Sequence, residues 1–148
     1  MLQPNKILVI RFSSLGDLIL TSPIFRELRR IFPGANLNLL TSVGFGDVLD
    51  NNPHLDRIIK HPRKENFEQL NQLIEELQAE EFDLIYDAHR SMRSRWIVSR
   101  LTAFGMKRKP AVWKINKRTL NRKLLIHLGW NRLQQGLSQR EQWLLPLK

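Results

Sequence analysis

The stretch Lys6-Ile-Leu-Val-Ile-Arg-Phe-Ser-Ser-Leu-Gly-Asp17 decides the fold. A continuous apolar run breaks into Ser-Ser-Leu-Gly, and an amphipathic helical pattern follows at once with Asp17 at its entrance. This order predicts a buried parallel strand that enters a helix through a tight turn. Open α/β sheets bind their ligands at such turns. A carboxylate held there faces the crevice above the sheet, so Asp17 is the first candidate for chemistry.

Strand and helix patterns alternate along the rest of the chain. Further strands are expected at 36–41, 56–61, 82–87 and 110–115. Helices are expected at 18–32, 66–80, 91–104 and 116–128, with a short one at 45–51. Pro23 inside the first helix predicts a kink or a helix in two parts. The repeated β-α-β order predicts an α/β fold, a Rossmann-like parallel sheet with helices on both faces, formed by residues 1–148 as a single domain.

Composition excludes several classes of protein. Hydrophobic residues make up 42% of the chain, which is typical of a globular protein. No apolar run approaches the roughly 20 residues that span a bilayer, and the N-terminus lacks a signal-peptide core. The absence of cysteine excludes disulfides and fits a reducing cytoplasm. The four histidines are not spaced like metal ligands, so no metal site is expected.

The excess of positive charge lies entirely in the C-terminal part of the chain. Through residue 88 there are nine Lys and Arg against thirteen Asp and Glu, a balance of −4. From His89 onward there are fifteen against the single acid Glu141, a balance of +14. Such a one-sided field attracts polyanions: phosphorylated substrates, nucleic acid or an anionic membrane.

Asp17 has two plausible roles. At the end of the first strand it can act as a general base that takes a proton from a substrate hydroxyl. Asp is also a favoured helix N-cap, worth about 1 kcal/mol. The sequence leaves both roles open. Ser13, Ser14 and the N–H groups of the turn are donors suited to phosphate or sugar oxygens. Because Gly16 is the only glycine of the turn, a dinucleotide-binding fingerprint is absent.

A second polar group follows the fourth expected strand. It reads Asp87-Ala-His89-Arg90-Ser91-Met92-Arg93-Ser94-Arg95. Because parallel strands end at one edge of a sheet, this loop is expected to share a crevice with Asp17. Arg93 and Arg95 can clamp anionic groups with their forked guanidinium groups. His89 either binds substrate, orients Asp87 or is an ordinary turn residue.

A third group of cations includes Lys117 and Arg118, on an expected helix with a leucine stripe. We expect these cations to hold anionic groups of a substrate. Nucleic-acid binding is a weaker alternative, because no nucleic-acid-binding fold is recognised. It would weaken steeply with salt.

Three segments together resemble the glycosyltransferase family nine heptosyltransferases, which build the inner core of lipopolysaccharide. They are K-I-L-V-I-R-F-S-S-L-G-D-L-I-L-T-S-P, N-P-H-L-D-R-I-I and F-D-L-I-Y-D-A-H-R-S-M-R-S. The first segment, with its S-x-G-D turn, is quite specific, and the other two support it. The resemblance runs from Lys6 to past Ser94.

The resemblance implies the N-terminal half of a GT-B glycosyltransferase, an enzyme of two Rossmann-like domains that needs no metal or other cofactor. The catalytic base of the family matches Asp17, and the substrate-facing turn matches Ser13 and Ser14. Asp87, His89 and Arg93 match a segment that lines the cleft. The family transfers sugar with inversion from a nucleotide sugar, typically ADP-heptose, to a phosphorylated lipopolysaccharide core precursor. A cytoplasmic location, peripheral to the inner membrane, is implied as well.

One departure concerns the second domain, which binds the nucleotide sugar in this family. The chain ends at Lys148, so we expect only the acceptor-side domain, with a complementary chain as one source of the donor side. The alternative function is an inactive half-domain that binds an acidic glycolipid or a partner protein.

Overall fold

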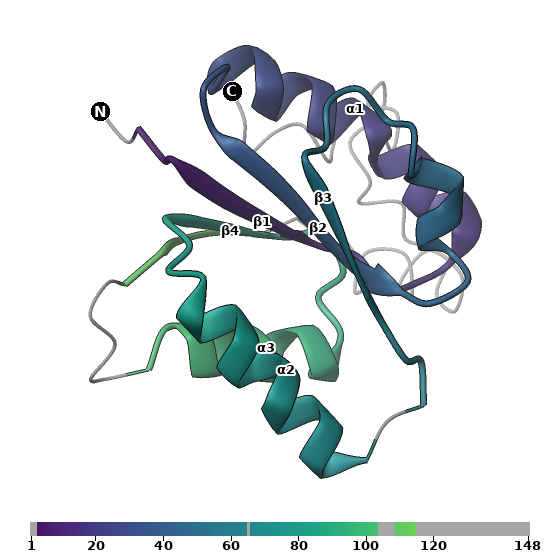
Figure 1. Ribbon diagram of the computed structural model, residues 1–148, viewed down its shortest axis with the longest axis vertical. Coiled ribbons are helices and arrows are strands. Elements are labelled where there is room, and N and C mark those ends of the chain that lie inside the picture. The colour runs from purple at the N-terminus through teal and green to yellow at the C-terminus, as the bar shows by residue number, and fades with distance from the viewer. Residues whose placement is uncertain (1–2, 65, 104–108, 115–148) are drawn as a thin grey trace, which may run out of the picture.

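The computed structural model describes residues 3–64, 66–103 and 109–114. They form a five-stranded parallel sheet in the order β3-β2-β1-β4-β5 (Figure 1). The strands are β1 (Lys6–Ile10), β2 (Asn36–Ser42), β3 (Arg57–His61), β4 (Leu84–Asp87) and β5 (Ala111–Lys114). The helices are α1 (Leu15–Ile31), the short 3₁₀ helix η1 (Gly46–Leu49), α2 (Phe67–Ala79) and α3 (Met92–Leu101).

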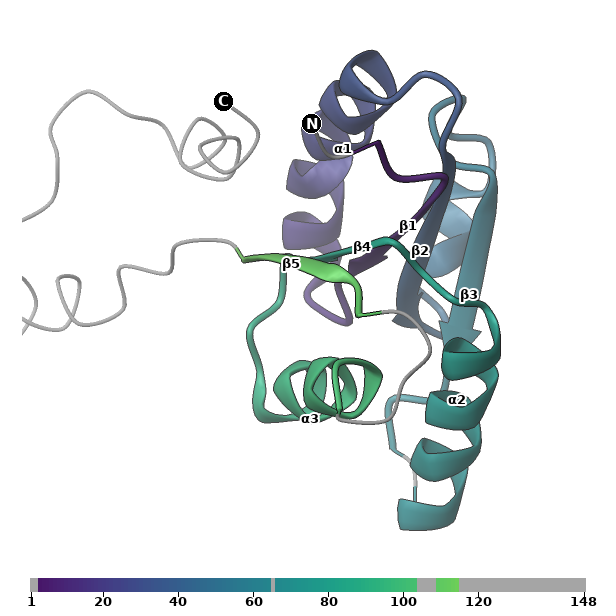
Figure 2. The same cartoon turned by 90° about the vertical axis from the view of Figure 1, so that its left-hand side faces the viewer.

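Helices cover both faces of the sheet. α1 lies on one face, and α2 and α3 lie on the other (Figures 1 and 2). Each face has its own hydrophobic core, one with the buried side chains of α1 and one with those of α2 and α3. The chain therefore uses one face while it moves outward from β1 to β3, and the opposite face from α2 onward, as it returns to β4 and continues to β5. This change of face is what right-handed crossovers require when the direction of strand addition reverses.

The central strand β1 explains the apolar run in the deciding stretch. Ile7 and Val9 point into the α1 core, whereas Leu8 and Ile10 point into the core of α2 and α3. All four side chains are fully buried. A strand covered on both faces needs apolar residues at every position, not at alternate ones.

The predicted elements are confirmed within a few residues wherever the structure describes them. α1 begins at Leu15, three residues before its predicted start, because Ser14 is the N-cap. The alternative of a helix in two parts is wrong, since Pro23 lies inside one continuous helix of 17 residues. The predicted helix 116–128, with Lys117 and Arg118, lies outside the described residues. None of the helices in the described ranges is long and apolar enough to cross a membrane.

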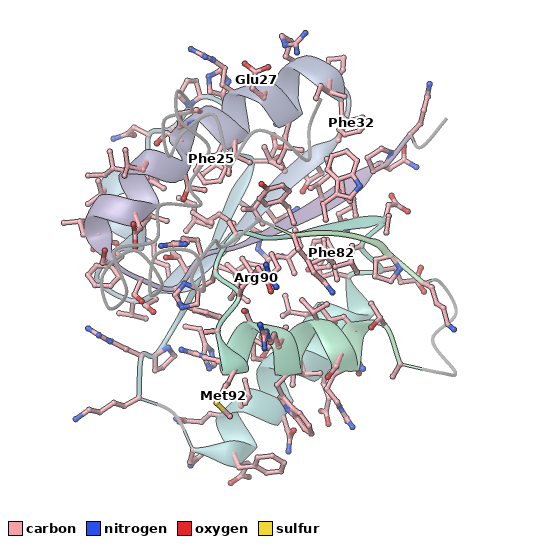
Figure 3. The ribbon with its side chains drawn as sticks, turned by 180° about the vertical axis from the view of Figure 1, so that it is seen from behind. Phe25, Glu27, Phe32, Phe82, Arg90 and Met92 are labelled. Atoms are coloured by element: carbon pink, nitrogen blue, oxygen red, sulfur yellow. The ribbon has the colours of Figure 1, made fainter. Side chains whose placement is uncertain are left out.

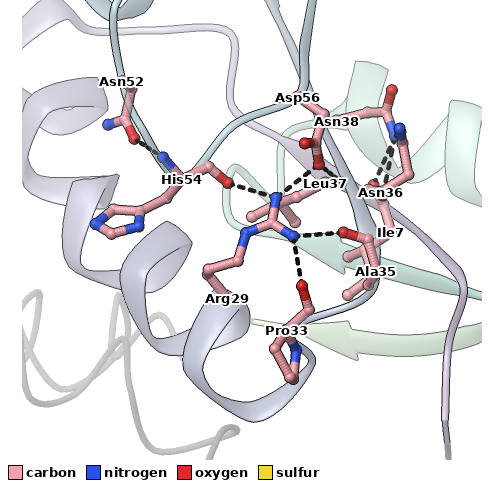
Figure 4. Close-up of polar contacts among 10 residues, drawn as sticks. All are labelled: Ile7, Arg29, Pro33, Ala35, Asn36, Leu37, Asn38, Asn52, His54 and Asp56. Carbon is pink, nitrogen blue, oxygen red and sulfur yellow. Dashed lines mark hydrogen bonds and ion pairs between the residues drawn. The ribbon is translucent and has the colours of Figure 1, made fainter.

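Two carboxylates fix the starts of the central strands. Asp83, just before β4, accepts hydrogen bonds from the N–H groups of Asn5 (2.7 Å) and Lys6 (3.0 Å) at the start of β1. Asp56, just before β3, accepts one from the N–H of Leu37 (2.6 Å) in β2 (Figure 4). Both acids belong to segments that resemble the heptosyltransferases. Asp83 and Asp56 thus contribute to the resemblance through residues that hold the sheet together, not through residues of the candidate site.

Arg29 completes the contact around Asp56. Its guanidinium lies 2.6 Å from the Asp56 carboxylate and also donates to the carbonyls of Pro33, Ala35 and His54 (Figure 4). The end of α1, the start of β2 and the loop before β3 are thereby joined at the edge of the sheet opposite to Asp17. Arg29 and Asp56 therefore have a structural role at this edge, and the candidate site lies at the other edge.

Candidate active site

The candidate site lies where the order of the strands reverses. β1 pairs with β2 on one side and with β4 on the other, in parallel register. The loops that follow β1 and β4 therefore leave neighbouring strands at the same edge, and their helices cover opposite faces. In open α/β sheets such a point is where ligands bind, because the diverging loops leave a crevice between them. The prediction that the two polar loops adjoin is confirmed.

Arg11 joins the two loops. This residue directly follows β1, and only 4% of it is exposed. One guanidinium nitrogen lies 2.5 Å from the Asp17 carboxylate, and the other donates to the Ala88 carbonyl after β4 (2.5 Å). Burial lowers the pKa of the Arg11 guanidinium, while the negative charges of Asp17 and Asp87 oppose that shift. A buried arginine is stabilised by such partners, so Arg11 holds the two loops together.

Asp17 occupies the first turn of α1 as part of a cap. Its carboxylate Oδ2 contacts Arg11, the hydroxyl of Ser14 (3.2 Å) and, more distantly, the Ser14 N–H (3.5 Å). Ser14 is the N-cap, so the expectation that Asp17 itself could fill this position is wrong; Asp17 lies three residues further on. Its side chain remains 36% exposed. In the described part of the chain all three contacts reach Oδ2, so Oδ1 is the oxygen available to a substrate.

Asp87 is bound by the protein itself. Only 1% of this residue is exposed. Oδ1 accepts from the N–H groups of His89 (3.0 Å) and Arg90 (2.7 Å), and Oδ2 accepts from the Ser94 hydroxyl (3.2 Å). These bonds stabilise a tight turn in which Arg90 has a positive φ of 51°. The buried carboxylate therefore shapes the loop, and the expected contact of Asp87 with an acceptor stays a prediction.

His89 and Arg93 gather around Phe12, the residue after Arg11. The His89 ring meets the Phe12 ring edge-on, with 5.8 Å between centroids. The Arg93 guanidinium lies 4.0 Å above the same ring and donates to the Pro62 carbonyl (3.0 Å). A cation over an aromatic face is favourable and fixes the arginine in place. The backbone N–H of His89 contacts Asp87, and the expectation that the imidazole orients this carboxylate stays a prediction.

The other predicted site residues that the structure describes, Ser13, Ser14 and Arg95, lie at the same edge. Ser13 is half-buried and Ser14 is exposed in the turn after β1. Arg95 is exposed in the first turn of α3. The site thus presents one partly exposed carboxylate, hydroxyl groups and guanidinium groups, a set suited to a polar, anionic substrate. Among the described ranges, no three His, Asp or Glu side chains come together in a way that could hold a metal ion.

Sequence reasoning missed Arg11 and Phe12. Arg11 extends an apolar strand by one residue, and a charge in such a position needs a buried partner. With Asp17 six residues later, that signal was available from the sequence. Phe12 gave no comparable signal, because an aromatic residue after a strand is most often part of the core.

Comparisons with curated proteins find similarity to lipopolysaccharide heptosyltransferases. No protein-family model matches the chain. Lipopolysaccharide heptosyltransferase 1 of Escherichia coli (strain K12) is 28% identical over 111 residues, which cover 69% of this chain and 34% of that protein. The protein of the same name from Pseudomonas aeruginosa is 27% identical over 101 residues, which cover 62% of this chain and 28% of that protein. The chain thus spans about a third of the length of these curated relatives.

Solved structures share the architecture. A glycosyl transferase of family 9 from Veillonella parvula matches with a TM-score of 0.67 and 22% identity, over 80% of this chain and 38% of that one. An E. coli heptosyltransferase with ADP matches with a TM-score of 0.64 and 21% identity, over 93% of this chain and 44% of that one. The predicted Rossmann-like parallel sheet is therefore confirmed, and it matches the sheet of these glycosyltransferase structures. Together these findings confirm that the chain resembles the glycosyltransferase family nine heptosyltransferases.

Proposed function

We propose that this chain is the acceptor-binding part of a glycosyltransferase of lipopolysaccharide core assembly. The sugar would come from a nucleotide sugar such as ADP-heptose, and the acceptor would be a phosphorylated core precursor or a similar anionic glycolipid. One observation carries the proposal: Asp17 is partly exposed at the strand-order reversal and is held there by the buried Arg11. The sequence motif around it is the one that resembles the heptosyltransferases.

In the proposed reaction, Asp17 is the general base. Its Oδ1 takes the proton of an acceptor hydroxyl, and the acceptor oxygen forms a bond to the anomeric carbon of the donor. The bond from this carbon to the diphosphate breaks with inversion, and the nucleoside diphosphate leaves with the electron pair. Arg11 and Ser14 bind Oδ2 of Asp17, so the carboxylate is fixed and Oδ1 has a defined orientation toward the acceptor hydroxyl. Fixed orientation is a large part of what an enzyme contributes to such a step. Inversion and independence of metal remain predictions.

Anionic groups of the acceptor would meet cations of the second loop. Arg93 and Arg95 both lie at the start of α3; Arg95 is exposed, and the Arg93 guanidinium is held over the Phe12 ring. His89 lies beside Phe12, and its ring would offer the acceptor a further hydrogen-bond donor. Lys117 and Arg118 are proposed to extend this cationic surface. Asp87 would act indirectly, because it fixes the loop that carries the other residues.

The donor side of the reaction is a separate part of the proposal. The chain spans about a third of the length of the curated relatives, so a complementary chain or segment would bind the nucleotide sugar. A second candidate function is binding of an acidic glycolipid or a partner protein without catalysis. Either function would operate on the cytoplasmic side of the inner membrane.

A transfer assay tests the proposal. The purified chain is incubated with ADP-heptose and a lipopolysaccharide core precursor, alone and with a candidate donor-binding subunit. Asp17→Asn is expected to lower the rate by about 100- to 10,000-fold, the range typical of a general base, while acceptor binding changes little. Asp47→Asn is the matched control, because Asp47 is an exposed carboxylate paired with Lys60. Unchanged transfer by Asp17→Asn would defeat the role of Asp17. Acceptor binding with no transfer under any condition would favour the non-catalytic function.

A further inference from the structure

We propose that the starts of α2 and α3 form a surface that docks on an anionic lipid bilayer. This surface, called the basic–apolar rim below, consists of Arg63, Lys64, Phe67, Met92 and Arg95. It goes beyond the proposed transfer reaction, because it concerns where the domain is held and needs neither the donor nor Asp17.

The apolar part of the rim is unusually exposed. Met92 is 88% exposed and Phe67 is 67% exposed, the two highest values among the large hydrophobic side chains that the structure describes. The core of this face is complete without them, because α2 and α3 bury their own apolar side chains further along. Met92 lies on the side of α3 away from the sheet (Figure 3). Two such residues at a helix start have no role in the core and are available to insert into a lipid interface.

The two helix starts lie on the same edge of the molecule. α2 and α3 follow the parallel strands β3 and β4, so both helices begin at the edge where the strands end. The helices pack side by side over one face of the sheet (Figures 1 and 2). The Arg93 guanidinium at the start of α3 donates to the Pro62 carbonyl in the loop that leads to α2 (3.0 Å). The rim is thus one continuous region of this edge.

The charges of the rim favour an anionic partner. Arg63, Lys64 and Arg95 are exposed, and none of them forms an ion pair with another residue in the described ranges. By contrast, Lys6 and Lys60 are paired with carboxylates. Two acids lie beside these cations in the sequence, Glu65 and, in the first turn of α2, Glu68.

A bilayer fits this combination better than a folded protein does. Unpaired cations beside protruding apolar tips match a surface with anionic headgroups above acyl chains. Each set of residues alone binds weakly, and stable attachment takes both an apolar and an electrostatic contribution. The rim also borders the candidate site, since Arg95 follows the loop of Asp87 and His89. A domain docked in this way would present its acceptor-binding edge to the membrane.

Vesicle binding of the whole chain tests this inference without any sugar donor. Vesicles of phosphatidylcholine with phosphatidylglycerol are compared with vesicles of phosphatidylcholine alone, at low and high salt. Binding is expected only with the anionic lipid and is expected to fall as salt rises. The double variant Phe67→Ser/Met92→Gln should weaken it by at least about tenfold, and Arg63→Gln/Lys64→Gln by a similar factor. Arg26→Gln/Arg30→Gln is the matched control, because both cations are exposed on α1.

A site-specific probe locates the contact. The chain has no cysteine, so Met92→Cys and Val48→Cys each accept one environment-sensitive fluorophore. Val48 is an exposed apolar residue in η1, on the opposite face of the sheet. We expect a blue shift with anionic vesicles at position 92 and little shift at position 48. Equal vesicle binding by wild type and the Phe67/Met92 double variant, or equal probe shifts at both positions, would overturn the proposal that the basic–apolar rim docks on the bilayer. Transfer activity could persist in either case, so the two proposals fail separately.

Discussion

The Arg11 guanidinium contacts the Asp17 carboxylate at 2.5 Å while it donates to the Ala88 carbonyl at the same distance. A single buried side chain therefore connects the first turn of α1 to the loop after β4. The candidate base does not stand alone in its turn, and its position depends on a residue from the central strand. Because Ile7 to Ile10 of β1 are fully buried beside it, Arg11 is held by the core, and a change at Arg11 should affect both loops at once.

Arg11→Met should destabilise the protein and loosen both loops. The variant keeps the length of the side chain but leaves the Asp17 carboxylate and the Ala88 carbonyl without their donor. A loss of about 2 kcal/mol in the free energy of unfolding is expected, less than for a fully buried pair because Asp17 is partly exposed. Urea unfolding measures the loss. Arg11→Lys should recover part of it, since lysine keeps the charge but lacks the fork. Equal stability of Arg11→Met and wild type would contradict the bridging role.

Asp87→Ala separates a positioning role from an acceptor contact. Its carboxylate accepts three hydrogen bonds in a buried site, so its removal should cost about 2–4 kcal/mol. Hydrogen exchange should show faster exchange of the His89 and Arg90 amides. Asp87→Asn is the matched control, because its amide oxygen can still accept from both N–H groups. A stable Asp87→Ala variant that binds acceptor poorly would instead restore the direct contact expected from the sequence.

The fold was largely predictable because its signals are local. Continuous apolar strands, amphipathic helices and their stop signals located every described element, and the alternation of elements indicated a parallel sheet. Predictions failed where side-chain contacts, local or distant, decide the outcome. The start of α1 moved to Leu15 because the Ser14 cap and the Asp17 carboxylate act together. Pro23 did not divide the helix, whose side chains are held by the core of that face.

The candidate site was predictable in its location and less so in its roles. Asp17 and Asp87 both follow buried strands, and their sequence contexts do not tell them apart. The structure distinguishes them by burial, since Asp17 remains partly exposed while Asp87 is enclosed by the turn that it stabilises. Which carboxylate oxygens of Asp17 and Asp87 are bound by the protein depends on backbone N–H groups and on Arg11. The directions of these donors are set by the folded turns and cannot be read from the sequence.

Pro23→Ala should stabilise α1. Proline has no N–H to donate to the carbonyl four residues earlier, and its ring crowds that turn. In a helix that is nevertheless continuous, alanine restores the donor, and a gain of about 1 kcal/mol is expected after the lost packing of the half-buried ring. Thermal and urea unfolding measure the change. Ser22→Ala, at the neighbouring half-buried position, serves as the control and should gain only a few tenths of a kcal/mol. Destabilisation by Pro23→Ala would mean that packing of the ring outweighs the missing hydrogen bond.

Asp56→Asn should make stability less dependent on acid pH. Partial burial alone would raise the pKa of Asp56, but the Leu37 N–H and the Arg29 guanidinium outweigh it and hold this pKa below its ordinary value of 3.8. Such a carboxylate stabilises the fold fully above its unfolded pKa, and the contribution is lost as the pH falls through the lower folded value. At pH 7 the variant should therefore lose about 1 kcal/mol, a modest amount because the side chain is partly exposed. The difference in the free energy of unfolding between wild type and variant should close below about pH 3.8.

Urea titrations across this pH range measure the difference. Asp47→Asn, at a more exposed carboxylate, is the control and should change stability by less at every pH. A difference that persisted unchanged into strong acid would show that Asp56 stabilises the strand start without its charge.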